Sequence, residues 1–143
     1  MIAARTIIKA KKKRDFGLEA LWGYNAGWFT GEGNGAHLAA LGALKEILQG
    51  LSHEEISFLI RQDILSGEML TPAINGVFAA PDAKTMMHTL KRGISRPAVL
   101  MKLNRATRAG SKIFRHYMNY PKAWDARSFA AWQSRAEAYF RGI

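Results

Sequence analysis

The sequence predicts an all-α protein: a single compact domain of about five or six helices that carries a basic N-terminal arm. Apolar residues recur at spacings of three and four along several stretches, and no stretch alternates apolar and polar residues as a strand does. Capping residues, glycines and prolines separate these stretches. With 143 residues, 48% hydrophobic and 22% charged, the composition excludes a disordered tail and favours one globular unit.

The basic arm covers residues 1–14, and the helical domain covers residues 15–143. The arm holds six basic side chains and no acid, and it ends in Lys11, Lys12, Lys13 and Arg14. Because a block of like charges repels itself, we expect this arm to be mobile when free. Two interpretations stay open: it lies along phosphates or an acidic surface, or it is a solubilising tail.

Residues 16–29 are expected to form a loose helix rich in aromatic residues. The apolar positions follow a helical period, although three glycines weaken it. The aromatic side chains favour a place in the core over stacking on unpaired bases. In the glycine-rich turn that follows, Asn34 is expected to cap the next helix, and a phosphate cradle is the weaker interpretation because Glu32 would repel an anion.

An acidic helical hairpin is predicted over residues 35–66. Leucines at 38, 41, 44, 48 and 51 predict one helix that Gly50 ends. Ser52 and Glu55 have the spacing of a capping box, which starts a second helix with Ile56, Leu59, Ile60 and Ile64 facing inward and Gly67 as its stop. A short turn joins the two helices, so they are expected to pack as an antiparallel pair.

Basic helices are predicted over residues 83–141. Asp82 is a candidate cap for a helix over residues 83–92, after a short helical turn near Thr71. Pro121 ends the long helix before it, and the last helix is expected to start after Asp125. In that last helix Phe129, Trp132, Ala136, Tyr139 and Phe140 are expected to face inward, and Arg127, Arg135 and Arg141 outward.

Charge is strongly segregated along the chain. The net charge of +10 divides into +6 for residues 1–14, −7 for residues 15–82 and +11 for residues 83–143. No acidic side chain lies between Asp82 and Asp125. Such segregation is typical of proteins that bind nucleic acid, although a solvated basic face without a specific partner would look the same.

The long helix over residues 97–117 is the centre of the functional prediction. Its apolar residues form one row along the helix: Val99, Leu103, Ala106, Gly110, Ile113 and Tyr117. Its basic residues form a second row on another side: Lys102, Arg105, Arg108, Lys112 and Arg115. One side would enter the core and the other would meet a polyanion. Whether the helix is continuous through Gly110 is left open.

Residues 93–104 begin with a glycine, an isoleucine and a serine ahead of Arg96 and Pro97. This stretch resembles the turn and recognition helix of helix-turn-helix DNA-binding proteins. The resemblance implies a left-handed Gly93, a buried Ile94, Ser95 as helix cap and outward-facing Ser95, Arg96, Ala98, Leu100 and Lys102. The complete set of predicted nucleic-acid-binding residues is Lys91, Arg92, Ser95, Arg96, Lys102, Arg105, Arg108, Lys112, Arg115, Lys11, Lys12, Lys13 and Arg14.

The predicted function is therefore nucleic-acid binding, with DNA favoured over RNA. The alternative is a non-enzymatic inhibitor, assembly factor or particle component that docks its basic face on an acidic protein. Opposite charge blocks also allow head-to-tail self-association. An amphipathic helix on an anionic membrane ranks below these, because the core needs the apolar row of residues 97–117.

No catalytic activity, cofactor or metal site is predicted. The chain has no cysteine, and its four histidines lack metal-ligand spacing. No carboxylate pair stands out. A nuclease is the least unlikely activity, because the chain combines a basic face with an acidic middle. The sequence shows neither a signal-peptide core nor a membrane-spanning run, and a cytoplasmic location is expected.

Overall fold

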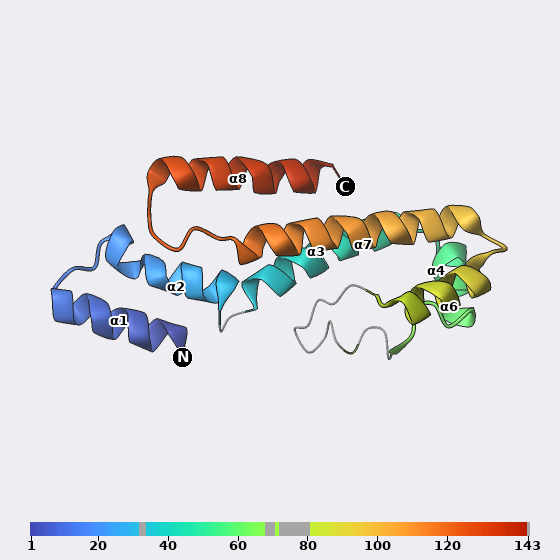
Figure 1. Cartoon of the computed structure of the whole chain (residues 1–143), viewed down its shortest axis with the longest axis horizontal. Helices are drawn as coiled ribbons and strands as arrows, with labels where there is room; N and C mark the ends of the chain where they lie inside the picture. The colour runs from blue at the N-terminus through green and yellow to red at the C-terminus, as the bar shows by residue number, and fades with distance from the viewer. Residues whose placement is uncertain (32–33, 68–70, 72–80, 143) are drawn as a thin grey trace.

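The computed structural model describes residues 1–31, 34–67, 71 and 81–142, and within these residues it is all helical (Figure 1). The predicted fold class is confirmed, with seven helices in the described part of the chain. They are α1 (Ile2–Lys13), α2 (Leu18–Thr30), α3 (Gly35–Gln49), α4 (His53–Arg61), α6 (Ala83–Gly93), α7 (Pro97–Met118) and α8 (Ala126–Arg141). Except for Thr71 itself, the short turn predicted near that residue lies outside the described residues.

The longest helix, α7, runs along the middle of the molecule and contacts most of the others (Figure 1). It is continuous through Gly110, and its predicted apolar row is confirmed, because Val99, Leu103, Ala106, Gly110 and Ile113 are all buried. The sequence thus specifies which side of α7 faces the core. Tyr117, at the end of the row, is half-buried.

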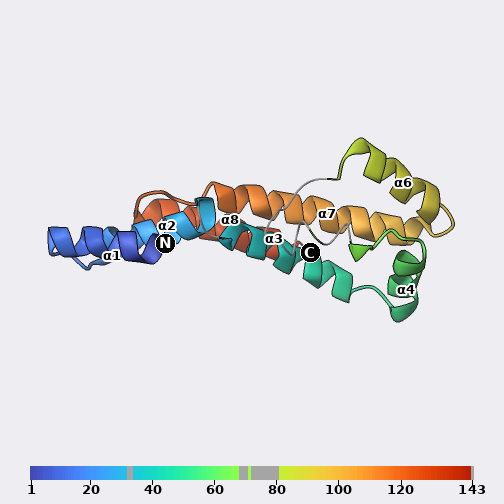
Figure 2. The same ribbon diagram turned by 90° about the horizontal axis from the view of Figure 1, so that it is seen from below.

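The main partner of α7 is α3, which lies antiparallel to it in Figures 1 and 2. The most deeply buried side of α3 carries Ala36, Ala40 and Ala43, whereas Leu38 is 57% exposed. The five leucines correctly predicted this helix, but Leu38 lies outside the core. Small side chains let two helix backbones approach closely, and α7 presents Ala106 and Gly110 in its own buried row.

The predicted hairpin of residues 35–66 is also corrected. The capping box is present, since the Ser52 hydroxyl accepts from the Glu55 N–H and the Glu55 carboxylate accepts from the Ser52 N–H. However, α4 ends at Arg61, because Asp63 takes the left-handed conformation (φ 52°). The helix turns across the end of α3 instead of lying along it (Figure 2).

One apolar core forms where α4 meets the N-terminal half of α7. It consists of Leu51, Phe58, Leu59, Ile64, Val99 and Leu103. The turn after α4 allows the N–H of Ile64 to bond the carbonyl of Leu59, which brings the Ile64 side chain into this core. Ile60, predicted to face inward, is exposed, and Phe58 takes that role.

A second, aromatic core joins α2, the C-terminal end of α7 and α8. It centres on Trp22 and Tyr120, whose rings are stacked 5.4 Å apart, with Phe29, Trp124, Phe129 and Trp132 packed around them. The Trp22 indole N–H donates to the carbonyl of Pro121 at 2.7 Å. The predicted start of the last helix after Asp125 is confirmed, and the Asp125 side chain caps it. Tyr139 and Phe140 near the end of α8 are partly exposed and were wrongly placed inward.

The N-terminal arm was predicted to be mobile, but residues 2–13 form the helix α1. This helix packs on α2. Thr6 and Ala10 are buried between them. A β-carbon at Gly27 would lie 2.8 Å from the Ile2 side chain. Gly27, which weakens α2 as an isolated helix, is thus what admits α1 at this close distance.

Candidate functional site

Five cations stand along the outer side of α7. Pro97 occupies the first turn of this helix, where its missing N–H costs nothing. All members of the predicted basic row are exposed: Lys102, Arg105, Arg108, Lys112 and Arg115. The row is thus displayed as predicted, but its members differ in what they contact.

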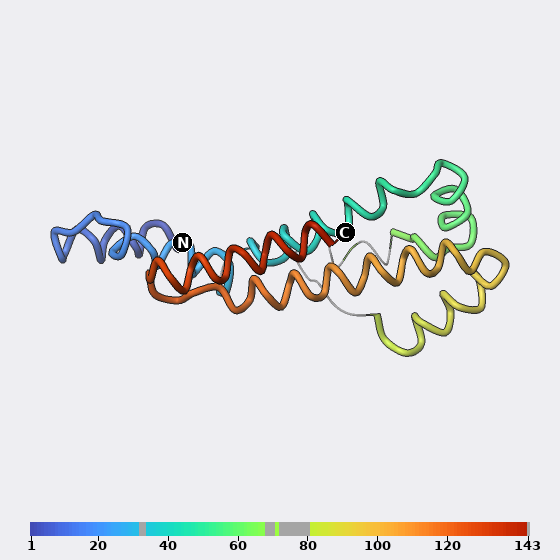
Figure 3. The backbone as a smooth tube through the Cα atoms, turned by 90° about the horizontal axis from the view of Figure 1, so that it is seen from above, coloured from blue at the N-terminus to red at the C-terminus, as the bar shows by residue number. Residues whose placement is uncertain are grey.

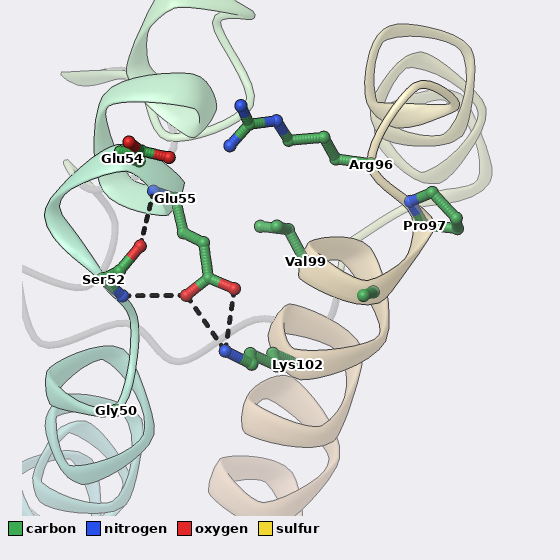
Figure 4. A pocket seen from close by; sticks show the side chains of 9 residues that line it. Gly50, Ser52, Glu54, Glu55, Arg96, Pro97, Val99 and Lys102 are labelled. Carbon is green, nitrogen blue, oxygen red and sulfur yellow. Dashed lines mark hydrogen bonds and ion pairs between the residues drawn. The ribbon is translucent and has the colours of Figure 1, made fainter.

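Lys102 is already paired with an acid of the same chain. Its Nζ lies 2.8 and 3.0 Å from the two carboxylate oxygens of Glu55, the same carboxylate that completes the capping box (Figure 4). The hydrogen bond from Lys102, followed by the one from the Ser52 backbone, lowers the pKa of Glu55. Lys102 therefore bridges α7 to α4, and the nucleic-acid contact predicted for it would require it to leave this partner.

Arg96 also turns toward α4. Its guanidinium lies 5.3 Å from the centre of the Phe58 ring, a distance typical of cation–π contact. Arg96 and Lys102 line an open pocket of ≈ 560 Å³ together with Glu54 and Glu55 (Figure 4). Two carboxylates balance the two cations there, so this pocket is a poor site for a polyanion.

The remaining cations of the row are better placed to meet an anion. Arg105 donates to the carbonyl of Gly142 at 3.2 Å, and Arg115 Nε donates to that of Ser111 at 3.3 Å. Both bonds join a guanidinium group to a backbone carbonyl. Arg108 and Lys112 form no ion pair or hydrogen bond with the described residues.

The turn between α6 and α7 differs in detail from the resemblance to helix-turn-helix proteins. Gly93 lies within α6 and does not adopt a left-handed conformation. Ile94 is 78% exposed, so it does not anchor the turn. Ser95 does not cap α7, whose N-cap is Arg96, and Leu100 packs against the core instead of facing outward.

What makes Gly93 necessary is close packing. A β-carbon there would lie 2.3 Å from Leu100 Cδ2.

The two cations before Gly93 differ in what they contact. Lys91 is exposed, and Arg92 donates to the carbonyl of Gln62 at 3.1 Å. Arg92 Nη1 also lies 3.8 Å from Asp63.

The basic residues at the end of α1 lie far from those of α6 and α7. Lys11, Lys12, Lys13 and Arg14 are exposed. They occupy one end of the long axis, and the N-terminal end of α7 occupies the other (Figure 1). The structure does not bring the two predicted groups of cations together into one site.

Two of the four histidines, His37 and His116, take part in the packing. The His116 ring stacks on Trp132, with centroids 4.7 Å apart, and its Nε2 lies 3.0 Å from the Trp132 carbonyl. Burial lowers the pKa of His116. His37 stacks on Phe114. In the described part of the chain, no three histidine or acidic side chains are grouped as metal ligands.

Sequence reasoning missed a set of exposed apolar side chains at the α6 end of the molecule. They are Met86, Met87, Leu90, Ile94 and, on α7, Met101. The signal was present, since Met86, Leu90 and Ile94 are spaced four apart, as in an amphipathic helix. Among the helices of the described residues, none is both long and apolar enough to cross a bilayer.

Comparison with known proteins gives one informative similarity. No protein-family model matches the chain. Over 136 residues, 94% of its length, it is 28% identical to the digeranylgeranylglycerophospholipid reductase of Sulfolobus acidocaldarius. The chain spans only 29% of that reductase. The similarity therefore covers nearly all of this chain but less than a third of the relative.

Proposed function

We propose that the chain is a helical module that binds anionic glycerophospholipid, equivalent to one part of a larger lipid-modifying protein. The observation that carries the proposal is the exposed cationic row of α7, in a stretch without any acidic side chain between Asp82 and Asp125. The name of the similar reductase supports a phospholipid as the anion. A glycerophospholipid carries a phosphate, which is what such a row attracts.

Arg108 and Lys112 would make the main phosphate contacts. They lie four residues apart on the same side of α7, one helical turn from each other. Each Lys or Arg near an anionic lipid surface contributes about 1 kcal/mol, and salt weakens this attraction. Arg105 and Arg115, at their two sides along the helix, would add to the same surface.

Cosedimentation with lipid vesicles tests this proposal. The chain should bind phosphatidylglycerol vesicles at low salt and release them at high salt, and it should not bind neutral phosphatidylcholine vesicles. Replacing Arg108→Gln together with Lys112→Gln should weaken binding about 30-fold, since two contacts of about 1 kcal/mol are lost. The matched control removes two exposed arginines of α8, Arg127→Gln with Arg135→Gln. Equal binding to both vesicle types would reject the proposal.

Nucleic-acid binding is the second candidate, and the same row of cations favours it. Lys102 is paired with Glu55, so the four other exposed cations of the row are the candidate phosphate contacts. The logarithm of the binding constant should then fall with the logarithm of salt concentration with a slope of about −3.5. A gel-shift titration with duplex DNA, single strands and RNA measures this slope, and no shift at low salt would reject this candidate.

A further inference from the structure

Helix α6 turns its apolar side away from its own protein. The side that packs on α7 carries Thr85 and Thr89, which are half-buried, and Gly93, which is buried against Leu100. At about 100° per residue these three positions form one narrow stripe of the helix. In Figure 3 α6 lies at one end of the molecule, and α4 lies on the other side of α7. Helix α6 thus packs on α7 through small and polar residues.

The apolar side of α6 is exposed along its whole length. We define the α6 apolar face as Met86, Met87, Leu90 and Ile94, which are 53%, 68%, 55% and 78% exposed. These four residues fall within roughly 100° of the helix circumference. Met101 of α7, 73% exposed, adds a fifth large apolar side chain at the same end of the molecule. A contiguous apolar face of this kind indicates a partner.

Cations border this face on the side away from α7. Lys84, His88 and Lys91 are exposed and follow the apolar face around the helix, and α6 contains no acid. An exposed apolar side with a lysine border is the pattern of helices that lie in the interface of an anionic membrane. A second copy of the chain fits less well, because a twofold contact through this face would bring the two lysine borders together.

We propose that the α6 apolar face inserts into the surface of an anionic lipid bilayer, with α6 parallel to the membrane plane and Lys84 and Lys91 at the phosphate level. This inference rests on the proposed function and assigns its docking element. Methionine side chains are flexible and suit such insertion, since they adapt to irregular apolar surroundings. The cations of α7 would then act as a further phosphate-binding row beside the inserted helix.

The absence of cysteine allows a direct test. The full chain with Met87→Cys, labelled with an environment-sensitive fluorophore, is mixed with phosphatidylglycerol vesicles. We expect a blue shift and a severalfold rise in emission. The same label at Ser134→Cys, an exposed position on α8, should stay in water. Equal responses at the two positions, or no response at Met87→Cys while the chain cosediments with the vesicles, would overturn the inference.

A pair of variants gives a second readout. Met87→Asp with Leu90→Asp should weaken binding to phosphatidylglycerol vesicles more than tenfold. The matched control, Ile7→Asp with Ile8→Asp, introduces the same two charges at exposed apolar positions of α1 and should bind several times more tightly than the α6 variant. Far-UV circular dichroism verifies that both variants keep their helical content. Equal loss in the two variants would show that charge alone matters and would overturn insertion of α6.

These outcomes separate the two proposals. If the unaltered chain does not bind anionic vesicles, both proposals fail together. If it binds, and only the Arg108→Gln and Lys112→Gln variant weakens binding, the phosphate row stands and insertion of α6 is rejected. A blue shift without vesicles that grows with protein concentration would show that a second copy covers the face, which also rejects the lipid docking of α6.

Discussion

The contact between α3 and α7 makes a prediction that opposes what the leucine pattern suggests. Ala40 has no exposed surface, whereas Leu38 is 57% exposed. Replacing Ala40 by leucine should therefore lower the free energy of unfolding more than removing the Leu38 side chain does. Burying a whole leucine side chain contributes about 1.5–3 kcal/mol, and Leu38 is less than half buried. Leu38→Ala should therefore lower the free energy of unfolding by about 1 kcal/mol or less.

Ala40→Leu adds three carbon atoms where two backbones are close together. Overpacking of this kind costs about 1–3 kcal/mol, which is about 3–9 °C in Tm for a chain of this size. Urea unfolding followed by circular dichroism measures both variants, and Lys45→Leu, at an exposed position of α3, controls for the added bulk. The reasoning is refuted if Leu38→Ala costs more than Ala40→Leu, because the leucine side would then be the one that faces the core.

Three further predictions concern the packing and the pH dependence of stability. Gly35→Ala should destabilise the protein despite the better helix propensity of alanine, because its β-carbon would lie 2.4 Å from the Phe29 ring. The hydrogen bond from Lys102 lowers the pKa of Glu55 below its ordinary value of 4.5. The stability that this bond supplies is therefore complete above pH 4.5 and is lost as the pH falls through the lowered pKa. Glu55→Gln should remove this pH dependence of stability. Burial lowers the pKa of His116, so stability should fall as pH drops below 6.5, and His116→Gln should reduce that fall.

Each of these three predictions has a result that would contradict it. A rise in Tm for Gly35→Ala would show that the ring moves aside. Urea midpoints recorded from pH 3 to 6 test Glu55, and a curve unchanged in Glu55→Gln would mean that the contact with Lys102 does not persist in solution. An NMR titration of His116 tests the third, which an imidazole pKa at or above 6.5 would contradict.

Local patterns in the sequence predicted the described helices other than α1, and they predicted the buried side of α7. Ser52 and Asp82 accept hydrogen bonds from the third residue of the helix they cap, as predicted. Asp125, after which the last helix was expected to start, does the same. The row from Val99 to Ile113 is buried because it follows the helical period over four turns without interruption. Such features depend on neighbouring residues alone, which is why the sequence specifies them.

What depended on distant residues could not be predicted. Periodicity located α3, but the choice of the Ala40 side over the Leu38 side depends on α7, whose Gly110 and Ala106 accept a close neighbour. Lys102 belonged to the predicted cationic row, yet its partner Glu55 lies 47 residues earlier in the chain. The exposed cationic row of α7 was therefore predictable from the sequence. The pairing of Lys102 with Glu55, which removes one cation from that row, was not.

The antiparallel pairing of α3 with α7 has a consequence for biosynthesis. The two helices are joined by a long intervening segment, so α3 leaves the ribosome well before the helix that covers it. Until α7 follows, the alanine stripe of α3 has no native surface to meet, and contacts of such long sequence separation form late in folding. Growing chains should therefore resist proteolysis within α3 only once residues up to Met118 have been released.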